Sequence, residues 1–329
     1  MQDTLLAEIT RGQVVESQHF GAYVVADATG AIVAHGGNFE DPIFPRSAVK
    51  ALQALPLVAT GAADRLGLTA AELALACASH AGEPAHIEIA TAMLAKAGRD
   101  FTCLECGAHW PSSRRAMRAL AAAGQSPSAL HNNCSGKHSG FVCTAIAQNQ
   151  DPTGYIAATH PTMAQVTRAL SIATGTDLST QTPATDGCSI PTYQFPMASL
   201  ATGFARFATA AHLPQDFADA AIKLRAAIAQ NPFMVAGTER FDTVVMQALG
   251  AKAFVKTGAE GVYCAALPDQ GLGIALKCRD GATRAAEAAM AAVLTKFLGP
   301  HDILSKYTTQ TLTNWNGLTI GEIRAPIPT

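Results

Sequence analysis

The sequence predicts an α+β fold in which strands from both ends of the chain join into one antiparallel sheet around a helical middle region. Runs of strand-forming residues at 5–36 are divided by glycine-containing turns, and three more such runs lie at 253–277. Between them, apolar residues recur at helical spacing and are punctuated by proline and glycine. We therefore expect helices on the faces of the sheet and one domain over residues 1–329, with a helical region at about 60–250 inserted between the terminal strands.

The first strands are predicted at residues 5–10, 14–16, 23–26 and 31–35. A helix is expected at 47–60, where Pro56 interrupts the apolar spacing and Gly61 closes it. The next helix, at 69–77, begins with Thr69 and has Glu72 three residues later, which is the pattern of a capping box.

Proline before and glycine after an apolar run predict several of the remaining helices. We expect helices at 84–97, 111–123, 135–148, 161–174, 196–208, 216–230, 239–249 and 282–298. Closing strands are predicted at 253–256, 262–267 and 273–277. The passage 180–191 is polar and rich in turn residues, and the tail at 312–329 is expected to be irregular because it contains two prolines.

Composition excludes several classes of protein. The 329 residues are 49% hydrophobic and 15% charged, with a net charge of −2 and no basic cluster, so nucleic acid and anionic membranes are poor partners. No apolar run reaches the length of a membrane-spanning helix, and the first residues do not resemble a secretory signal. Eight scattered cysteines are not typical of a disulfide framework. We therefore expect a cytoplasmic protein with free thiols, metal ligands or catalytic groups.

Two segments carry serine hydrolase patterns. Ser47 and Lys50 are three residues apart and share one face of a predicted helix, near whose first turn a developing oxyanion is favoured. Lys256, Thr257 and Gly258 end a predicted strand, as in the third motif of penicillin-binding proteins and β-lactamases. Either pattern also fits ordinary helix or strand residues, and only their combination favours catalysis.

A second hydroxyl follows the predicted helix at 69–77. Ser79 lies in the small-residue segment 78–82 and is available to take part in such a site, although a helix-end serine usually has no special role. The Ser-Asp-Asn or Ser-x-Asn triplet of true β-lactamases is absent here.

Polar residues are concentrated in two loops. Residues 131–140 contain two histidines, two asparagines, a cysteine, a lysine and two glycines before a predicted helix, which indicates a functional loop. In segment 185–191, Asp186 is suited to bind a substrate ammonium group, and Cys188 is a candidate to share a metal with Cys134. Cys103 and Cys106 lack a second cysteine pair and are interpreted as buried thiols.

With these motifs, the chain over residues 5–323 resembles the class 3, rhizobial-type L-asparaginases, the asparaginase II family. The resemblance implies hydrolysis of L-asparagine to L-aspartate and ammonia, a fold related to serine β-lactamases and penicillin-binding proteins, and a homodimer. It also implies two Ser-Lys pairs, namely Ser47 with Lys50 and Ser79 with Lys256. A zinc site held by Cys134, Lys137 and Cys188 is implied as well, with a structural or substrate-orienting role.

We expect a serine nucleophile to be activated by a lysine whose pKa is lowered by burial and by a second amine. Ser47 is the predicted nucleophile, and Ser79 is its relay or alternative. Arg46, Asp186 and His138 are expected to bind the substrate. Two other functions remain open at this stage: a penicillin-recognising serine hydrolase, and a zinc-binding protein without catalysis.

Overall fold

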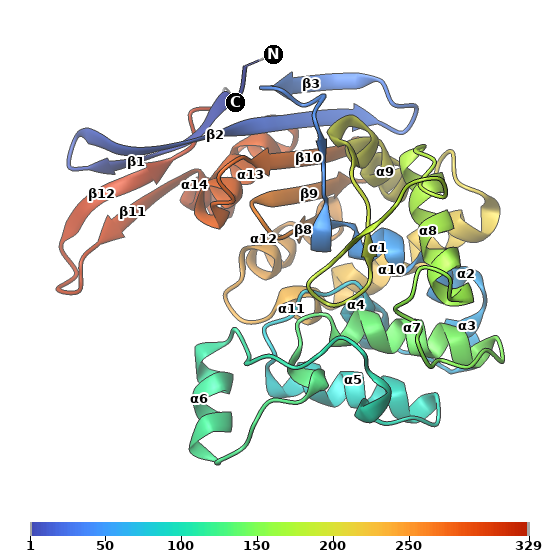
Figure 1. The fold of residues 1–329 in the computed structure, drawn as a ribbon. Coiled ribbons are helices and arrows are strands. Elements are labelled where there is room, and N and C mark those ends of the chain that lie inside the picture. Colours follow the sequence, from blue (N-terminus) through green and yellow to red (C-terminus); the bar gives the residue numbers. More distant parts are fainter. Residues whose placement is uncertain (1, 328–329) are drawn as a thin grey trace.

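The computed structural model describes residues 2–327, and its main feature is an eight-stranded sheet (Figure 1). All strand pairs in this sheet are antiparallel. Its strands are β1 (Thr4–Arg11), β2 (Val14–Asp27), β3 (Ile32–Gly36), β8 (Phe254–Thr257), β9 (Val262–Leu267), β10 (Leu272–Cys278), β11 (Thr309–Thr313) and β12 (Thr319–Arg324). They follow the order β11-β12-β1-β2-β10-β9-β8, with β3 paired to β2. The predicted α+β sheet built from the two chain ends is thus confirmed.

The N-terminal strand β2 is longer than the sequence pattern predicts. We expected separate strands at 14–16 and 23–26, and this is wrong because β2 continues through Gly21. A Cβ at position 21 would lie 2.0 Å from the carbonyl oxygen of Lys277 on the neighbouring strand. Glycine here therefore permits close packing within the strand, although glycine in a sequence usually indicates a break.

The expected irregular tail at 312–329 is wrong for residues 312–324, whereas residues 325–327 do lie outside regular structure. Residues 309–324 form the hairpin β11–β12, and β12 pairs with β1 through Glu8 opposite Arg324. The Asn314 side chain accepts hydrogen bonds from the backbone N–H groups of Asn316 and Leu318, so it stabilises the turn between the strands. Pro326 lies beyond the hairpin and does not interrupt it, and Pro328 lies outside the described residues.

Helices fill the region between the two sets of strands. They are α1 (Lys50–Gln53), α2 (Leu55–Ala59), α3 (Ala62–Arg65), α4 (Ala70–Ala76), α5 (Pro84–Lys96), α6 (Arg114–Ala122), α7 (Ser135–Ala147), α8 (Pro161–Thr174), α9 (Met197–Thr209), α10 (Gln215–Gln230), α11 (Pro232–Ala236), α12 (Phe241–Leu249), α13 (Thr283–Leu298) and α14 (Asp302–Thr308). Short 3₁₀ helices are η1 (Arg46–Val49), η2 (Phe101–Cys103), η3 (Ala129–His131) and η4 (Gly250–Lys252). Two small strand pairs join β4 (Pro42–Ile43) to β7 (Phe195–Pro196), and β5 (Ala184–Thr185) to β6 (Pro191–Thr192).

Most predicted helices are present, with shifted ends. The helix expected at 47–60 is divided into η1, α1 and α2, because the chain begins as a 3₁₀ turn and turns again before Pro56. The capping box of α4 is confirmed: Glu72 N–H donates to Thr69 Oγ1, and Thr69 N–H donates to the Glu72 carboxylate. Helix α6 begins only after Ser113, whose side chain caps it.

The centre of the sheet is covered on both faces. Every residue of β9 is buried, although alternate residues point to opposite faces. Helix α9 lies very close to β10, since a Cβ at Gly273 would lie 2.0 Å from the Ala201 carbonyl oxygen. Helix α13 also packs on β1, β9 and β10. Strand β8 lies at the sheet edge, next to β9, and it also contacts η1, α10 and α12.

Within residues 2–327, none of the helices combines the length and apolar character needed to cross a membrane.

Candidate active site

Ser79 lies between two buried lysines. It follows α4 and accepts hydrogen bonds from Lys50 Nζ and Lys256 Nζ, each at 2.9 Å. Lys50 begins α1 and Lys256 lies on the edge strand β8, so three separate segments of the chain meet at this hydroxyl. Both lysine side chains are fully buried. The predicted pairing of Ser79 with Lys256 appears as a direct contact, and the contact with Lys50 adds a second amine.

The two lysines have further backbone partners. Lys50 Nζ donates to the carbonyl oxygens of Ala78 at 2.6 Å and Asn133 at 3.4 Å. Lys256 Nζ donates to the carbonyl oxygen of Thr257 at 2.7 Å. Each amine is therefore held in one direction, toward Ser79.

The pKa of Lys256 is lowered to about 7, mainly because burial disfavours its charged form. Asp242 opposes this change, and the nearby amine of Lys50 adds to it. A large share of Lys256 is therefore neutral near pH 7, and a neutral amine can accept a proton from a hydroxyl.

Ser47 is placed differently from Ser79. It lies half-buried in η1, and its hydroxyl makes no hydrogen bond to another part of residues 2–327. Lys50 donates its side-chain hydrogen bonds to Ser79 and to backbone oxygens, with none to Ser47. Side chains three residues apart eclipse in a 3₁₀ turn, so Ser47 and Lys50 still lie on the same side of this segment. The expected pair thus shares a face without a direct hydrogen bond.

Arg46 precedes this serine and has an unusual backbone conformation. Its φ of 52° lies in the left-handed region, which costs of order 1–3 kcal/mol for a residue with a side chain. Its guanidinium donates to the carboxylate of Asp186, a pairing that the sequence does not indicate. Burial raises the pKa of Asp186, but Lys137 and Arg46 more than offset this, and the net result lies below the ordinary value.

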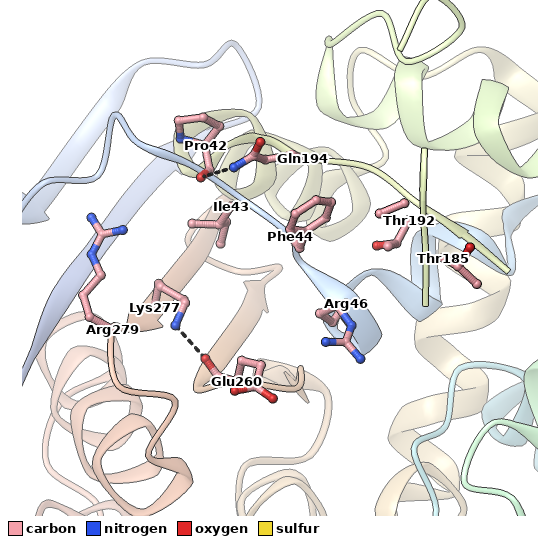
Figure 2. A pocket seen from close by; sticks show the side chains of 11 residues that line it. Pro42, Ile43, Phe44, Arg46, Thr185, Thr192, Gln194, Glu260, Lys277 and Arg279 are labelled. Atoms are coloured by element: carbon pink, nitrogen blue, oxygen red, sulfur yellow. Dashed lines mark hydrogen bonds between the residues drawn. The ribbon is translucent and has the colours of Figure 1, made fainter. Parts of the chain in front are cut away.

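A pocket of about 510 Å³ opens beside Arg46 (Figure 2). Besides Arg46, its lining includes Phe44, Thr185, Glu260 and Lys277, so its polar and apolar groups are mixed. Lys277 Nζ donates to the backbone oxygen of Glu260 at 2.7 Å, as the dashed line in Figure 2 shows. This pocket is not lined by Ser79, Lys50 or Lys256. Its lining includes Arg46, which directly precedes Ser47 in the sequence.

The three predicted metal ligands lie together beside Asp186. Lys137 Nζ donates to Cys188 Sγ at 3.0 Å, and Cys188 Sγ lies 3.4 Å from the Asp186 carboxylate. Cys134 Sγ lies 3.1 Å from Asn133 Oδ1, and all three candidate ligands are buried. The loop 131–140 and segment 185–191 therefore contact each other, although 51 residues separate Lys137 from Cys188.

The directions of the pKa shifts in this group favour an ionised Cys134 thiolate and a protonated Lys137 ammonium. A hydrogen bond from Cys188 is the main cause that lowers the pKa of Cys134, against the opposing effect of burial. Burial lowers the pKa of Lys137, but the two cysteines raise it further, so its net shift is upward. The two thiols match the soft ligands that zinc prefers, while the Lys137 amine can serve as a ligand only when it is neutral. A metal ion would have to displace the Lys137 proton.

His138 is enclosed by the protein. Its Nδ1 lies 2.6 Å from the Tyr155 hydroxyl, and its Nε2 is buried without a partner in residues 2–327. Phe141 packs against the same ring. Burial lowers the pKa of His138 well below its ordinary value, so the ring is neutral. It does not line the pocket beside Arg46, and substrate binding by His138 stays a prediction.

His80 makes a buried contact beside the site that local sequence patterns do not predict. The N–H of Gly82 donates to His80 Nδ1 at 3.1 Å, so the ring proton must be on Nε2. Nε2–H then donates to Ser135 Oγ at 2.8 Å, and Ser135 donates to Leu130 O. This chain of bonds joins the segment that carries Ser79 to the start of α7. In the sequence, the Ser-His-Ala-Gly run at 79–82 is the feature that could have indicated this contact.

The candidate metal site does not include Cys103, Cys106 or Cys278. Cys106 is buried and its pKa is raised to about 12 by burial, which matches the interpretation of an inert thiol, while Cys103 is half-buried. Cys278 lies within 4.8 Å of His19 and Asp280. His19 Nδ1 already lies 2.6 Å from the Asp280 carboxylate, and half of the Asp280 side chain is exposed, so we assign no metal there.

Comparisons with known proteins were made for the whole chain. A family model described as L-asparaginase II matches residues 7–325. A solved β-lactamase from Mycobacterium bovis is 14% identical, with 84% of this chain and 94% of that chain covered and a TM-score of 0.38. A solved structure of Mglu is 14% identical, with 90% and 69% covered and a TM-score of 0.37. No curated protein sequence is detectably similar. These TM-scores are too low for the two structures to establish the fold of this chain. The fold class is assigned from the eight-stranded sheet and the helices that cover it.

Proposed function

This chain belongs to the L-asparaginase II family, and on that premise we propose that it hydrolyses the side-chain amide of L-asparagine to L-aspartate and ammonia. Membership supports an amidohydrolase activity of the asparaginase type. One observation carries the proposal of a Ser-Lys mechanism: Ser79 Oγ lies 2.9 Å from two buried lysine amines. Such an arrangement supplies a hydroxyl, a base and a route for protons within one enclosed site.

In the proposed first step, Ser47 Oγ attacks the side-chain amide carbon of asparagine, and its proton passes by way of Lys50 and Ser79 to the neutral amine of Lys256. The C–N bond then breaks, the nitrogen takes up a proton, and ammonia leaves an aspartyl ester on Ser47. Water attacks this ester, and aspartate and the free serine are restored. Ser79 connects Lys50 to Lys256, so a proton held by one amine can pass to the other.

Arg46 and Asp186 are proposed to hold the charged ends of the amino acid. Their ion pair lies where η1 meets segment 185–191, beside the pocket and one residue from Ser47. An incoming carboxylate would compete for Arg46, and an incoming ammonium would compete for Asp186.

Purified protein is expected to release ammonia from L-asparagine. Hydroxylamine is expected to intercept the acyl-enzyme and give aspartyl hydroxamate, because it competes with water for the ester. A coupled ammonia assay and a colorimetric hydroxamate assay measure the two products. Absence of ammonia, together with covalent labelling by penicillin, would favour the penicillin-recognising hydrolase instead. Absence of both reactions, with zinc bound, would favour a non-catalytic zinc protein.

We also propose that Cys134, Lys137 and Cys188 hold zinc. When bound, the ion would neutralise the thiolates and orient the substrate near Asp186. The chemistry itself is assigned to the serines and lysines, which need no metal-bound hydroxide. Two further expectations, a homodimer and a cytoplasmic location, stay predictions.

Cys134→Ala is expected to lower the zinc content well below about one ion per chain, because it removes one of two thiolate ligands. It should raise KM about tenfold and change kcat less, since the proposed role of the ion is to orient substrate. Elemental analysis and steady-state kinetics measure these effects. Cys143→Ala is the matched control: this thiol lies on α7 and donates to the Met93 carbonyl oxygen, away from the ligand group. Unchanged zinc content in Cys134→Ala would refute the metal assignment.

A further inference from the structure

Asp242 is a buried carboxylate that the steps above do not use. It lies in the first turn of α12, is fully buried, and belongs to no ion pair within residues 2–327. An ionised carboxylate in such a place is costly unless hydrogen bonds and a nearby cation compensate for lost hydration. Its position close to Lys256 therefore points to a specific role.

Two hydrogen bonds orient the Asp242 carboxylate. The backbone N–H of Thr257 donates to Oδ1 at 2.8 Å, and the Tyr263 hydroxyl donates to Oδ2 at 2.7 Å. Thr257 ends β8 and Tyr263 lies opposite it on β9. The carboxylate thus fastens the end of the edge strand to α12.

The same threonine holds the catalytic amine. Thr257 accepts a hydrogen bond from Lys256 Nζ through its carbonyl oxygen at 2.7 Å, while its N–H group donates to Asp242. A single residue therefore lies between the carboxylate and the lysine. Displacement of Thr257 would move the acceptor that directs Lys256 toward Ser79.

We propose that Asp242 is a positioning residue for Lys256: it fixes the Thr257 backbone that directs this amine, and its negative charge controls how readily the amine keeps its proton. This inference rests on the proposed Ser-Lys hydrolysis. No contact between Asp242 and substrate is involved, and the residue acts only through Lys256 and Thr257.

The charges around Lys256 support this role. Burial lowers the pKa of Lys256, Asp242 is the main influence that raises it, and Lys50 lowers it, with a result of about 7. Without the Asp242 charge, the pKa would fall further. The titratable and charged groups that face Lys256 or Asp242 are Lys50 on α1, Cys77 after α4, Cys134 before α7, Arg240 before α12, Tyr263 and Cys264 on β9, Glu287 on α13 and Tyr307 on α14.

Any pH experiment must distinguish the titration of Glu287 from that of Lys256. Burial and Asp242 raise the pKa of Glu287 to about 7, so it titrates in the same range as the lysine. A pH profile alone would not distinguish them, and Glu287→Gln removes this second titration.

Asp242→Asn is the decisive variant because it removes the charge and keeps the shape. The amide oxygen can still accept from Thr257 N–H, and its NH₂ group can donate to the Tyr263 hydroxyl, which then acts as acceptor. The neutral form of Lys256 is the base, so activity rises with pH through its pKa. Loss of the negative charge lowers that pKa, and the acidic limb of kcat/KM for asparagine should move about one pH unit lower.

Tyr263→Phe is the matched control, because it removes one hydrogen bond to Asp242 and keeps the charge. Its acidic limb, and that of Glu287→Gln, should stay at the wild-type pH. An unmoved limb in Asp242→Asn would overturn the proposal, as would an equal shift in Tyr263→Phe. If Asp242→Asn does not fold, Asp242→Ser, which is neutral and able to accept from Thr257 N–H, should show the same downward shift.

A direct titration separates this inference from the proposed function. In protein with ¹³C-labelled lysine, the Lys256 signal, assigned with Lys256→Met, should titrate near pH 7 and shift about one unit lower in Asp242→Asn. That result would support the inference even if asparagine were not hydrolysed. Asparagine turnover with an unchanged Lys256 titration in Asp242→Asn would refute the inference and leave the function intact.

Discussion

Ser47→Ala is expected to lower kcat for asparagine hydrolysis by more than about a thousandfold, because no acyl-enzyme can form without the nucleophilic oxygen. The hydroxyl has no hydrogen-bond partner within residues 2–327, so its loss should leave the stability of the fold nearly unchanged. Ammonia release and hydroxamate formation measure the loss of activity, and the thermal unfolding midpoint measures stability.

Ser113→Ala is a suitable control for Ser47→Ala. Ser113 is also half-buried, and its side chain caps α6, which lies at the periphery of the molecule (Figure 1). This variant should lose a few tenths to about 2 kcal/mol of stability and keep its activity. Near wild-type ammonia release by Ser47→Ala would exclude Ser47 as the nucleophile.

Ser79→Ala is expected to lower kcat by about a hundredfold to ten-thousandfold, the range for loss of a proton-transfer group. Its hydroxyl is the acceptor for both Lys50 and Lys256, so the variant separates the two amines and stops proton exchange between them. KM should change much less, since the proposed substrate contacts are Arg46 and Asp186. Steady-state kinetics with asparagine separate the two parameters.

Ser79→Thr keeps a hydroxyl at the same position and should recover part of the activity that Ser79→Ala loses. Hydroxylamine distinguishes the roles of the two serines. If Ser47→Ala still formed aspartyl hydroxamate and Ser79→Ala did not, Ser79 would be the nucleophile and Ser47 the auxiliary hydroxyl.

Local patterns in the sequence were sufficient for most of the sheet and helices. Glycine misled the prediction of β2, because the close approach of Lys277 at Gly21 depends on a strand more than 250 residues later. The local pattern also fails for the hairpin β11–β12, since the prolines after it favour an irregular tail although the threonines of β11 alternate as in a strand. In both cases, long-range pairing overrode a local signal.

The site was predicted only in part, for a related reason. The family resemblance implied the pairing of Ser79 with Lys256, but nothing in the local sequence indicates that Lys50 also reaches Ser79 from 29 residues away. The pairing of Arg46 with Asp186, which are 140 residues apart, likewise could not be predicted from the local sequence. Asp242 lies within an ordinary amphipathic helix pattern, and only its contacts with Thr257 and Tyr263 distinguish it.

The pairing of β1 with β12 has a consequence for synthesis of the protein. Glu8 and Arg324, which are 316 residues apart, form a salt bridge across this strand pair. During translation, one edge of β1 therefore stays unpaired for on the order of tens of seconds, until β12 has left the ribosome. An unpaired strand edge is a template for wrong association. The proposed Ser-Lys site is likewise incomplete until Lys256, late in the sequence, has joined Lys50 and Ser79.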